Sequence, residues 1–91
     1  MLKKYADWTS EEGCIKGFNL RFSKQANIYR CIDYCKLKLA DRCKSIEWRE
    51  SDRQCTAQAT TKDELPEEFW SSPCYNGIAT NYSQQAAPDD V

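Results

Sequence analysis

The chain has 91 residues, of which 41% are hydrophobic and 30% are charged, and its mean hydropathy is -0.80. A chain of this length and polarity forms one domain with a thin hydrophobic core. No stretch approaches the ~20 apolar residues that cross a bilayer, so we expect no direct membrane insertion. The net charge of -1 gives no reason to expect a nucleic-acid partner.

Six cysteines and the lack of histidine indicate how the chain is stabilised. Structural zinc sites usually use CxxC pairs and often histidine, and this sequence contains neither. Six cysteines in so short a chain are typical of disulfides formed in an oxidising compartment. We therefore expect disulfides, no metal and no cofactor. The expected location is extracellular, either secreted or at the cell surface, or a secretory organelle.

The ends of the chain differ from its middle. Residues 1–13 predict a polar lead-in, the module itself is expected to span residues 14–82, and residues 83–91 predict a disordered tail or linker. The first element of the module is a strand. Its apolar residues alternate with polar ones at the period of a half-buried strand, and they are Phe18, Leu20 and Phe22.

A helix is predicted from Asn27, a good N-cap residue, to about Leu39 or Ala40. One arc of ~100° collects the residues expected to face the core. They are Ile28, Cys31, Ile32, Cys35 and Leu39. The far side carries Arg30, Asp33, Tyr34 and Leu37. Tyr34 and Leu37 are apolar enough either to lie under the N-terminal lead-in or to form part of a contact site.

A β-hairpin is predicted after the helix. In its first strand, Ile46 and Trp48 alternate with polar residues. Residues 50–53 are a polar turn, and residues 54–60 alternate again. Two strands joined by such a turn indicate an antiparallel pair with one apolar face.

The segment after the hairpin is less regular. Residues 61–68 form an acidic loop, in which Pro66 is suited to open a short helical turn. Residues 74–82 indicate a last strand. Asn76-Gly77 within that segment is also typical of a turn, so the two interpretations stay open here.

The cysteine spacing favours one disulfide pattern among the many that six cysteines allow. On a helix, Cys31 and Cys35 lie one turn apart on the face toward the sheet, so each should reach a sheet cysteine rather than the other. Cys43 follows the helix end that carries Cys35. The predicted disulfides are therefore Cys35–Cys43, Cys31–Cys55 and Cys14–Cys74.

The central cysteine region resembles the PAN/apple family. In that family a helix bears one cysteine and a second four residues on, and a third cysteine precedes a short aromatic-containing strand and a fourth cysteine. The matching residues here are Cys31, Cys35, the run Cys43-Lys-Ser-Ile-Glu-Trp and Cys55. The outer pair, Cys14 and Cys74, is similar to that of the apple subtype. The resemblance covers about residues 14–82.

This resemblance implies both a fold and a class of function. The implied fold is α+β, with a small disulfide-rich antiparallel sheet of about five strands that cradles one α-helix. The implied function is extracellular binding of proteins or carbohydrates. The family has no shared ligand and no catalytic residues, so it assigns no site residue.

The residue inventory itself argues against an enzyme. The usual general base for a Ser or Cys nucleophile is histidine, which the chain lacks. The cysteines are expected in disulfides, which removes a reactive thiolate. No Gly-rich phosphate loop is present. We therefore expect a non-catalytic binding module.

Several surface residues are candidates for that binding. For a protein partner they are Arg30 and Tyr34, because exposed aromatics beside arginine are common hot spots. For a sulfated glycan they are the basic residues near the helix end, Lys36, Lys38, Arg42 and Lys44. For a neutral glycan they are the aromatic platforms Trp70, Tyr75 or Tyr82. Core packing or solvated charge is the alternative interpretation of each set.

A free-standing disulfide-rich inhibitor or toxin is the alternative function, and residues 62–70 would be its contact loop. The start, MLKKYADW, lacks the apolar run of a signal peptide. We therefore expect this module to come from a larger secreted or surface protein with neighbouring modules. Asn81-Tyr82-Ser83 is an N-glycosylation sequon, which makes Asn81 a candidate glycosylation site.

Overall fold

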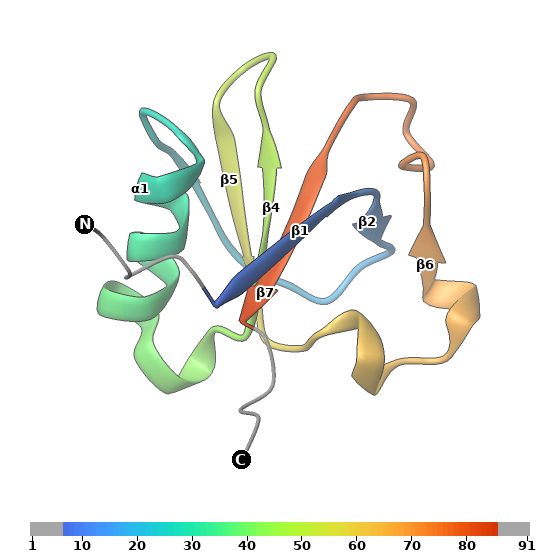
Figure 1. Ribbon diagram of the computed structural model, residues 1–91, viewed down its shortest axis with the longest axis horizontal. Helices are drawn as coiled ribbons and strands as arrows, with labels where there is room; N and C mark the ends of the chain where they lie inside the picture. The colour runs from blue at the N-terminus through green and yellow to red at the C-terminus, as the bar shows by residue number, and fades with distance from the viewer. Residues whose placement is uncertain (1–6, 86–91) are drawn as a thin grey trace.

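The computed structural model describes residues 7–85, and its elements lie in three layers (Figure 1). A helix lies on one side of a five-stranded sheet, and a small second sheet lies on the other. The large sheet is antiparallel with strand order β1-β7-β4-β5-β3. Its strands are β1 (Trp8–Glu12), β3 (Asn19–Lys24), β4 (Ser45–Arg49), β5 (Gln54–Gln58) and β7 (Asn81–Gln85). The small sheet pairs β2 (Cys14–Ile15) with β6 (Trp70–Ser71). The predicted α+β fold, with one helix packed on about five antiparallel strands, is confirmed.

Helix α1 (Ile28–Asp33) begins where the sequence predicts. The side chain of Asn27 caps it, because Asn27 Oδ1 accepts a hydrogen bond from the backbone N–H of Arg30 at 3.0 Å. The helix continues as a π-helical segment, Tyr34–Leu39, and ends in a 3-10 turn, Ala40–Arg42. The buried residues on this rod are Cys31, Ile32, Cys35 and Leu39, with Ile28 partly buried. The predicted core face is therefore correct.

The hydrophobic core lies between α1 and one face of the large sheet. On the helix side it contains Cys31, Ile32 and Cys35, and on the sheet side Ile46, Trp48 and Cys55. Strands β4 and β5 form the predicted hairpin, with the turn at residues 50–53. Trp8 from β1 packs against this core at its edge.

All six cysteines form disulfides, in the predicted pairs Cys14–Cys74, Cys31–Cys55 and Cys35–Cys43. The two inner disulfides fasten the helix to strand β5 and to the segment just before β4. The outer disulfide fastens β2 to the segment between β6 and β7. The helix layer and the small sheet are therefore each tied covalently to the rest of the domain.

The predicted domain boundaries were too narrow at both ends. Trp8–Glu12 falls in the predicted lead-in, but it forms strand β1 and pairs with β7. Residues 83–85 fall in the predicted tail, but they belong to β7. The two segments are held by backbone hydrogen bonds between β1 and β7. Such pairing does not require alternating apolar residues, so the sequence pattern does not reveal it. Residues 1–6 and 86–91, to which the rest of these predictions refers, lie outside the described residues.

The predicted last strand was also placed too early. Residues 74–80 form a loop, and the backbone N–H of Gly77 donates to the carbonyl of Cys74 at 2.9 Å in a turn. Gly77 has a φ of 77°, in the left-handed region that glycine adopts without strain. The turn interpretation of Asn76-Gly77 is therefore correct, and β7 begins only at Asn81.

Strand β3 forms as predicted, but two of the apolar side chains expected to be half-buried are exposed. They are Phe18, which directly precedes β3, and Phe22 within it. β3 is an edge strand with a bulge between Asn19 and Arg21. It pairs Phe22 with Thr56, on the sheet face that α1 does not cover.

Removing the outer disulfide with Cys14→Ser and Cys74→Ser should lower the free energy of unfolding by about 4 kcal/mol. This disulfide closes a loop with a sequence separation of 60, and cross-linking a longer loop restricts the unfolded chain more. Chemical denaturation monitored by circular dichroism measures the loss. The matched control, Cys35→Ser with Cys43→Ser, opens a loop with a separation of 8 and should lose only about 2.5 kcal/mol. A larger loss in the control would contradict the prediction.

Candidate binding cleft on the polar face of the sheet

The face of the large sheet that turns away from α1 carries polar side chains. Successive residues of a strand point to opposite faces, so Glu47 and Arg49 lie opposite Ile46 and Trp48. Residues paired directly across strands lie on the same face. The register therefore gives one row of Phe22, Thr56 and Glu47, and a neighbouring row of Gln54 and Arg49.

The small sheet covers part of this polar face. The backbone N–H of Ile15 in β2 donates to Oε2 of Glu47 at 2.7 Å, and Nε2 of Gln58 donates to the same oxygen at 2.9 Å. Next to this contact, Trp70 of β6 packs edge-on against Tyr82 of β7, with ring centroids 5.2 Å apart. One carboxylate oxygen and one aromatic pair therefore join the small sheet to the large one.

The uncovered part of the polar face is a cleft of about 150 Å³. Its floor is Glu47, Arg49, Gln54 and Thr56, and its wall includes Cys14, Cys74, Asn76 and Thr80. Two aromatic side chains, Phe22 and Tyr75, also line it and are 56% and 62% exposed. The outer disulfide places the wall, because it fastens residue 74 over the sheet.

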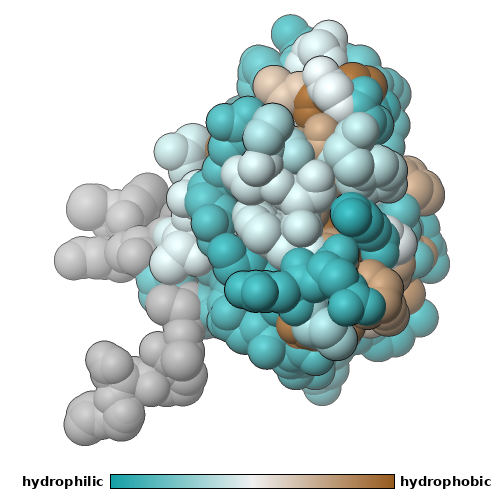
Figure 2. All heavy atoms as spheres, turned by 90° about the vertical axis from the view of Figure 1, so that its right-hand side faces the viewer, coloured by the Kyte–Doolittle hydropathy of each residue, from teal (hydrophilic) through white to brown (hydrophobic). Residues whose placement is uncertain are grey.

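Figure 2 shows the side of the molecule that carries the small sheet. Hydrophobic groups on this side form small separate patches between polar groups (Figure 2). Large exposed apolar patches are typical of extensive protein interfaces. This side therefore suits a small polar ligand better than a broad hydrophobic partner.

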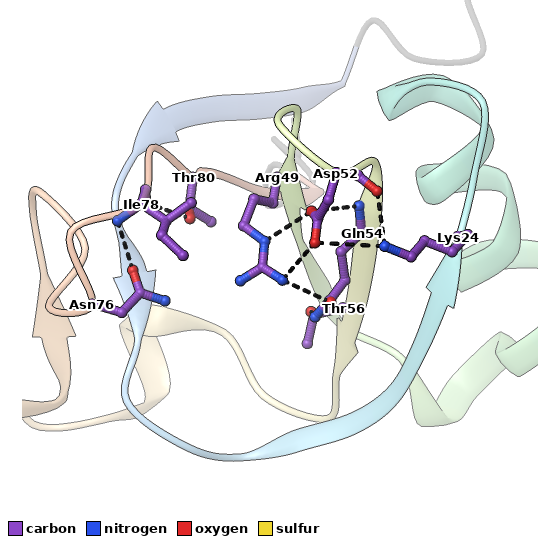
Figure 3. A network of polar contacts seen from close by, with 8 residues as sticks. All are labelled: Lys24, Arg49, Asp52, Gln54, Thr56, Asn76, Ile78 and Thr80. Atoms are coloured by element: carbon purple, nitrogen blue, oxygen red, sulfur yellow. Dashed lines mark hydrogen bonds and ion pairs between the residues drawn. The ribbon is translucent and has the colours of Figure 1, made fainter.

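Arg49 presents a hydrogen-bond donor to the cleft. Its Nε and Nη2 donate to the two carboxylate oxygens of Asp52 at 2.9 and 2.8 Å, and Nη2 also donates to Oε1 of Gln54 at 2.8 Å. The Arg49 guanidinium holds the pKa of Asp52 well below its ordinary value. Figure 3 shows the remaining nitrogen, Nη1, directed toward the loop with Asn76 and Thr80. No acceptor within residues 7–85 binds Nη1.

Glu47 presents an acceptor to the same cleft. Burial raises the pKa of Glu47 above its ordinary value of 4.5, against the lowering effect of the hydrogen bonds from Ile15 and Gln58. Both of those bonds use Oε2. Oε1 has no donor among the described residues, and it is not among their buried unpaired polar atoms. Oε1 therefore keeps some accessible surface, and Glu47 is one of the residues that line the cleft.

The structure divides the predicted helix-face residues between two hollows. Arg30, Tyr34 and Lys38 line a shallow, mostly apolar hollow beside Leu37, which is 74% exposed. Tyr34 is only partly exposed, because it also packs against the core. The predicted protein-contact pair, Arg30 and Tyr34, is thus brought together, and its role in binding stays a prediction.

The predicted basic cluster is not brought to one place. Lys36 and Lys44 line a separate hollow that also contains Trp8 and Glu64. Nζ of Lys44 lies 3.3 Å from a carboxylate oxygen of Glu64. The pKa of Glu64 is lowered, first by the backbone N–H of Thr61 and then by Thr60 and Lys44. Lys38 lines the other hollow, and Arg42 is exposed in the 3-10 turn.

Only one of the three predicted aromatic platforms is open. Tyr82 is 1% exposed, and its hydroxyl donates to Oε1 of Gln84 and accepts from the backbone N–H of Lys62. Burial raises the pKa of Tyr82 to about 12. Trp70 packs on Tyr82, and Nζ of Lys62 lies over the Trp70 ring, 4.2 Å from its centroid. Tyr75 remains available as a platform. Asn81, the sequon residue, is exposed at the start of β7.

Sequence reasoning missed the floor of the cleft. Glu47 and Arg49 were recognised only as the polar half of a strand, and Phe22 was assigned to a buried face. The sequence feature that points to this floor is the alternation of polar and apolar residues over Ser45–Arg49 and Gln54–Gln58. That alternation predicts an open second face, but it does not say that another segment encloses it.

Comparison with protein-family models, with curated proteins and with solved structures finds no match to this chain. Within residues 7–85, no helix is long and apolar enough to cross a membrane. The same residues hold no group of three or more metal-ligating side chains suited to bind an ion. The chemistry of the cleft must therefore be judged from its own geometry, which offers hydrogen-bond donors, acceptors and aromatic faces.

Replacing Glu47 with glutamine should stabilise the domain at neutral pH. Burial raises the pKa of Glu47 in the folded state, so the charged carboxylate lowers the free energy of unfolding above that pKa. This loss of stability disappears as the pH falls to 4.5. The glutamine oxygen still accepts both hydrogen bonds. Denaturation of both proteins across this pH range should show the gain from Glu47→Gln disappear toward pH 4.5.

The contrasting variant, Glu47→Ala, removes the acceptor itself. It leaves the backbone N–H of Ile15 unpaired and leaves Nε2 of Gln58 with only its 3.4 Å contact to Asn19, which should cost about 2 kcal/mol at every pH. If Glu47→Gln were as destabilising as Glu47→Ala at neutral pH, the charge of Glu47 would be needed for stability and the prediction would be wrong.

Proposed function

We propose that this chain is a non-catalytic extracellular binding module of the PAN/apple type, and that its cleft binds a glycan. The observation that carries the proposal is the composition of the cleft. Two exposed aromatic side chains, Phe22 and Tyr75, accompany a polar floor with an open donor on Arg49 and an open acceptor on Glu47. Small-ligand sites of this kind combine apolar faces with a few fixed polar groups.

The scaffold supports an extracellular module. Three disulfides are the mark of an oxidising compartment. One of them fastens α1 to strand β5, and another fastens the π-helical continuation of α1 to the segment just before β4. This arrangement agrees with what the PAN/apple resemblance implies. Exposure of the sequon residue Asn81 is compatible with glycosylation of a secreted protein.

A neutral glycan fits better than a sulfated one. A sulfated ligand needs several cations gathered on one surface. Lys36 and Lys38 line different hollows, and Lys44 is paired with Glu64. Near the cleft, the charge of Arg49 is matched by Asp52. A neutral ligand with hydroxyl groups can bind there without leaving a charge of its own unpaired.

Protein binding at the outer face of α1 and of the π-helical segment that follows it is the second candidate function. Leu37 is 74% exposed and lies in the hollow that Arg30 and Tyr34 line, and a contact of this composition suits a protein partner. A free-standing inhibitor has less support. Its contact loop would be residues 62–70, where Phe69 and Trp70 are only partly exposed.

Binding of the oxidised domain on a glycan array tests the proposed function. Tyr75→Ala and Phe22→Ala should each weaken binding to the best glycan about tenfold, since an aromatic contact of this kind contributes on the order of 1 kcal/mol or more. Tyr29→Ala, which removes an exposed aromatic on α1, is the matched control and should bind like the unmodified protein. An array without binding, or equal losses in all three variants, would contradict a glycan site in the cleft.

A further inference from the structure

Glu47 and Arg49 form an acceptor and donor pair on one strand. They are two residues apart on β4, and residues at this spacing lie about 7 Å apart on the same sheet face. In these two side chains, Oε1 of Glu47 and Nη1 of Arg49 are the polar atoms without a hydrogen-bond partner among residues 7–85. Both residues line the same cleft.

Both side chains are held in place before any ligand arrives. Arg49 is fixed by its bidentate contact with Asp52 and by Gln54 (Figure 3). Glu47 is fixed by Ile15 and Gln58 through its other oxygen. Groups that are already ordered lose little conformational entropy on binding. The pair is therefore suited to recognise a ligand with fixed hydroxyl geometry.

The charges around the cleft favour an uncharged ligand. Glu47 and Asp52 are acids, and Arg49 and Lys24 are bases, so the four charges sum to zero. Asp52 contacts both bases, with Lys24 Nζ at 3.5 Å. An anionic ligand would be repelled by the carboxylate of Glu47, and the charge of Arg49 is already paired with Asp52. A cationic ligand would meet the guanidinium.

The size of the cleft limits the ligand to one ring. Its volume of about 150 Å³ lies below the ~300–1,000 Å³ of sites that enclose drug-sized ligands. Phe22 and Tyr75 offer apolar faces against which the C–H face of a sugar ring can pack. The rest of an oligosaccharide would extend into solvent.

On the basis of the proposed function, we infer that the cleft recognises one neutral pyranose ring through two neighbouring hydroxyl groups. One hydroxyl accepts a hydrogen bond from Nη1 of Arg49, and the other donates to Oε1 of Glu47. The apolar face of the ring contacts Tyr75 or Phe22. Neutral monosaccharide units at the end of a glycan are therefore the ligand class.

The test is a titration of the oxidised, ¹⁵N-labelled protein with methyl glucoside, methyl galactoside, methyl mannoside and methyl glucuronoside, followed by amide chemical shifts. At least one neutral glycoside should shift the amides of residues 47, 49 and 54. Its affinity should be the same at low and high salt, because no charge pair forms with the ligand. The glucuronoside should bind at least tenfold more weakly, because its carboxylate faces Glu47.

Two variants test the hydroxyl pair itself. Glu47→Gln keeps an oxygen for Ile15 and Gln58, but turns a donor toward the cleft in place of the acceptor. Arg49→Lys keeps the charge but loses the planar fork. Each should weaken the neutral glycoside about tenfold or more, while the amide shifts of the free protein change only close to the substituted residue. Leu37→Ala, in the π-helical segment that continues α1, is the control and should bind normally.

The outcomes separate this inference from the proposed function. If glycans bind on the array and Glu47→Gln and Arg49→Lys both keep the affinity, the hydroxyl pair is wrong and the glycan site stands. Tighter, salt-sensitive binding of the glucuronoside would also overturn the inference alone. If neither the array nor any glycoside shows binding, both proposals fail.

Discussion

One oxygen atom, Oε2 of Glu47, accepts a hydrogen bond from the small sheet and, together with the packing of Trp70 on Tyr82, holds that sheet against the large one. It lies near the middle of a sheet face, where a carboxylate is costly to bury, and two donors offset part of that cost. Within the small sheet, Trp70 of β6 can pack against the start of β2 because residue 13 is glycine. A Cβ atom there would lie 2.4 Å from the ring of Trp70, and the φ of 141° also favours glycine. The cleft exists because the small sheet covers only part of the polar face of the large sheet.

The disulfides stabilise both sides of the large sheet, two on the helix side and one on the side of the small sheet. The core between α1 and the sheet is small, and two disulfides cross it. On the other side the buried groups include several polar ones, so stability there also depends on satisfied hydrogen bonds. Ser45 Oγ, for example, donates to the carbonyl of Thr60 at 2.6 Å, and Oε1 of the buried Gln58 lies 3.1 Å from the same hydroxyl. The third disulfide fixes the loop that walls the cleft.

The two exposed surfaces of the domain differ in chemistry. The outer face of α1 and its π-helical continuation presents Leu37 beside charged residues, so the shape of that face follows from local sequence. The cleft instead gathers residues from β3, β4, β5 and the loop after Cys74. A site assembled from several elements and ordered by internal hydrogen bonds suits a rigid ligand, which is why we assign the glycan to the cleft rather than to the helix.

The sequence alone determined the helix, its cap at Asn27, the hairpin and the pairing of all six cysteines. These features depend on periodicity and on short spacings such as that between Cys31 and Cys35, which local geometry converts directly into contacts. The strand partner of Trp8–Glu12 and the exposure of Phe22 were decided by tertiary structure. Backbone pairing between distant segments leaves no periodic signal, and the face that an edge strand exposes depends on its register and bulges. The cleft itself was decided in the same way, because Glu47 and Arg49 become a site only when the small sheet and the loop after Cys74 enclose them.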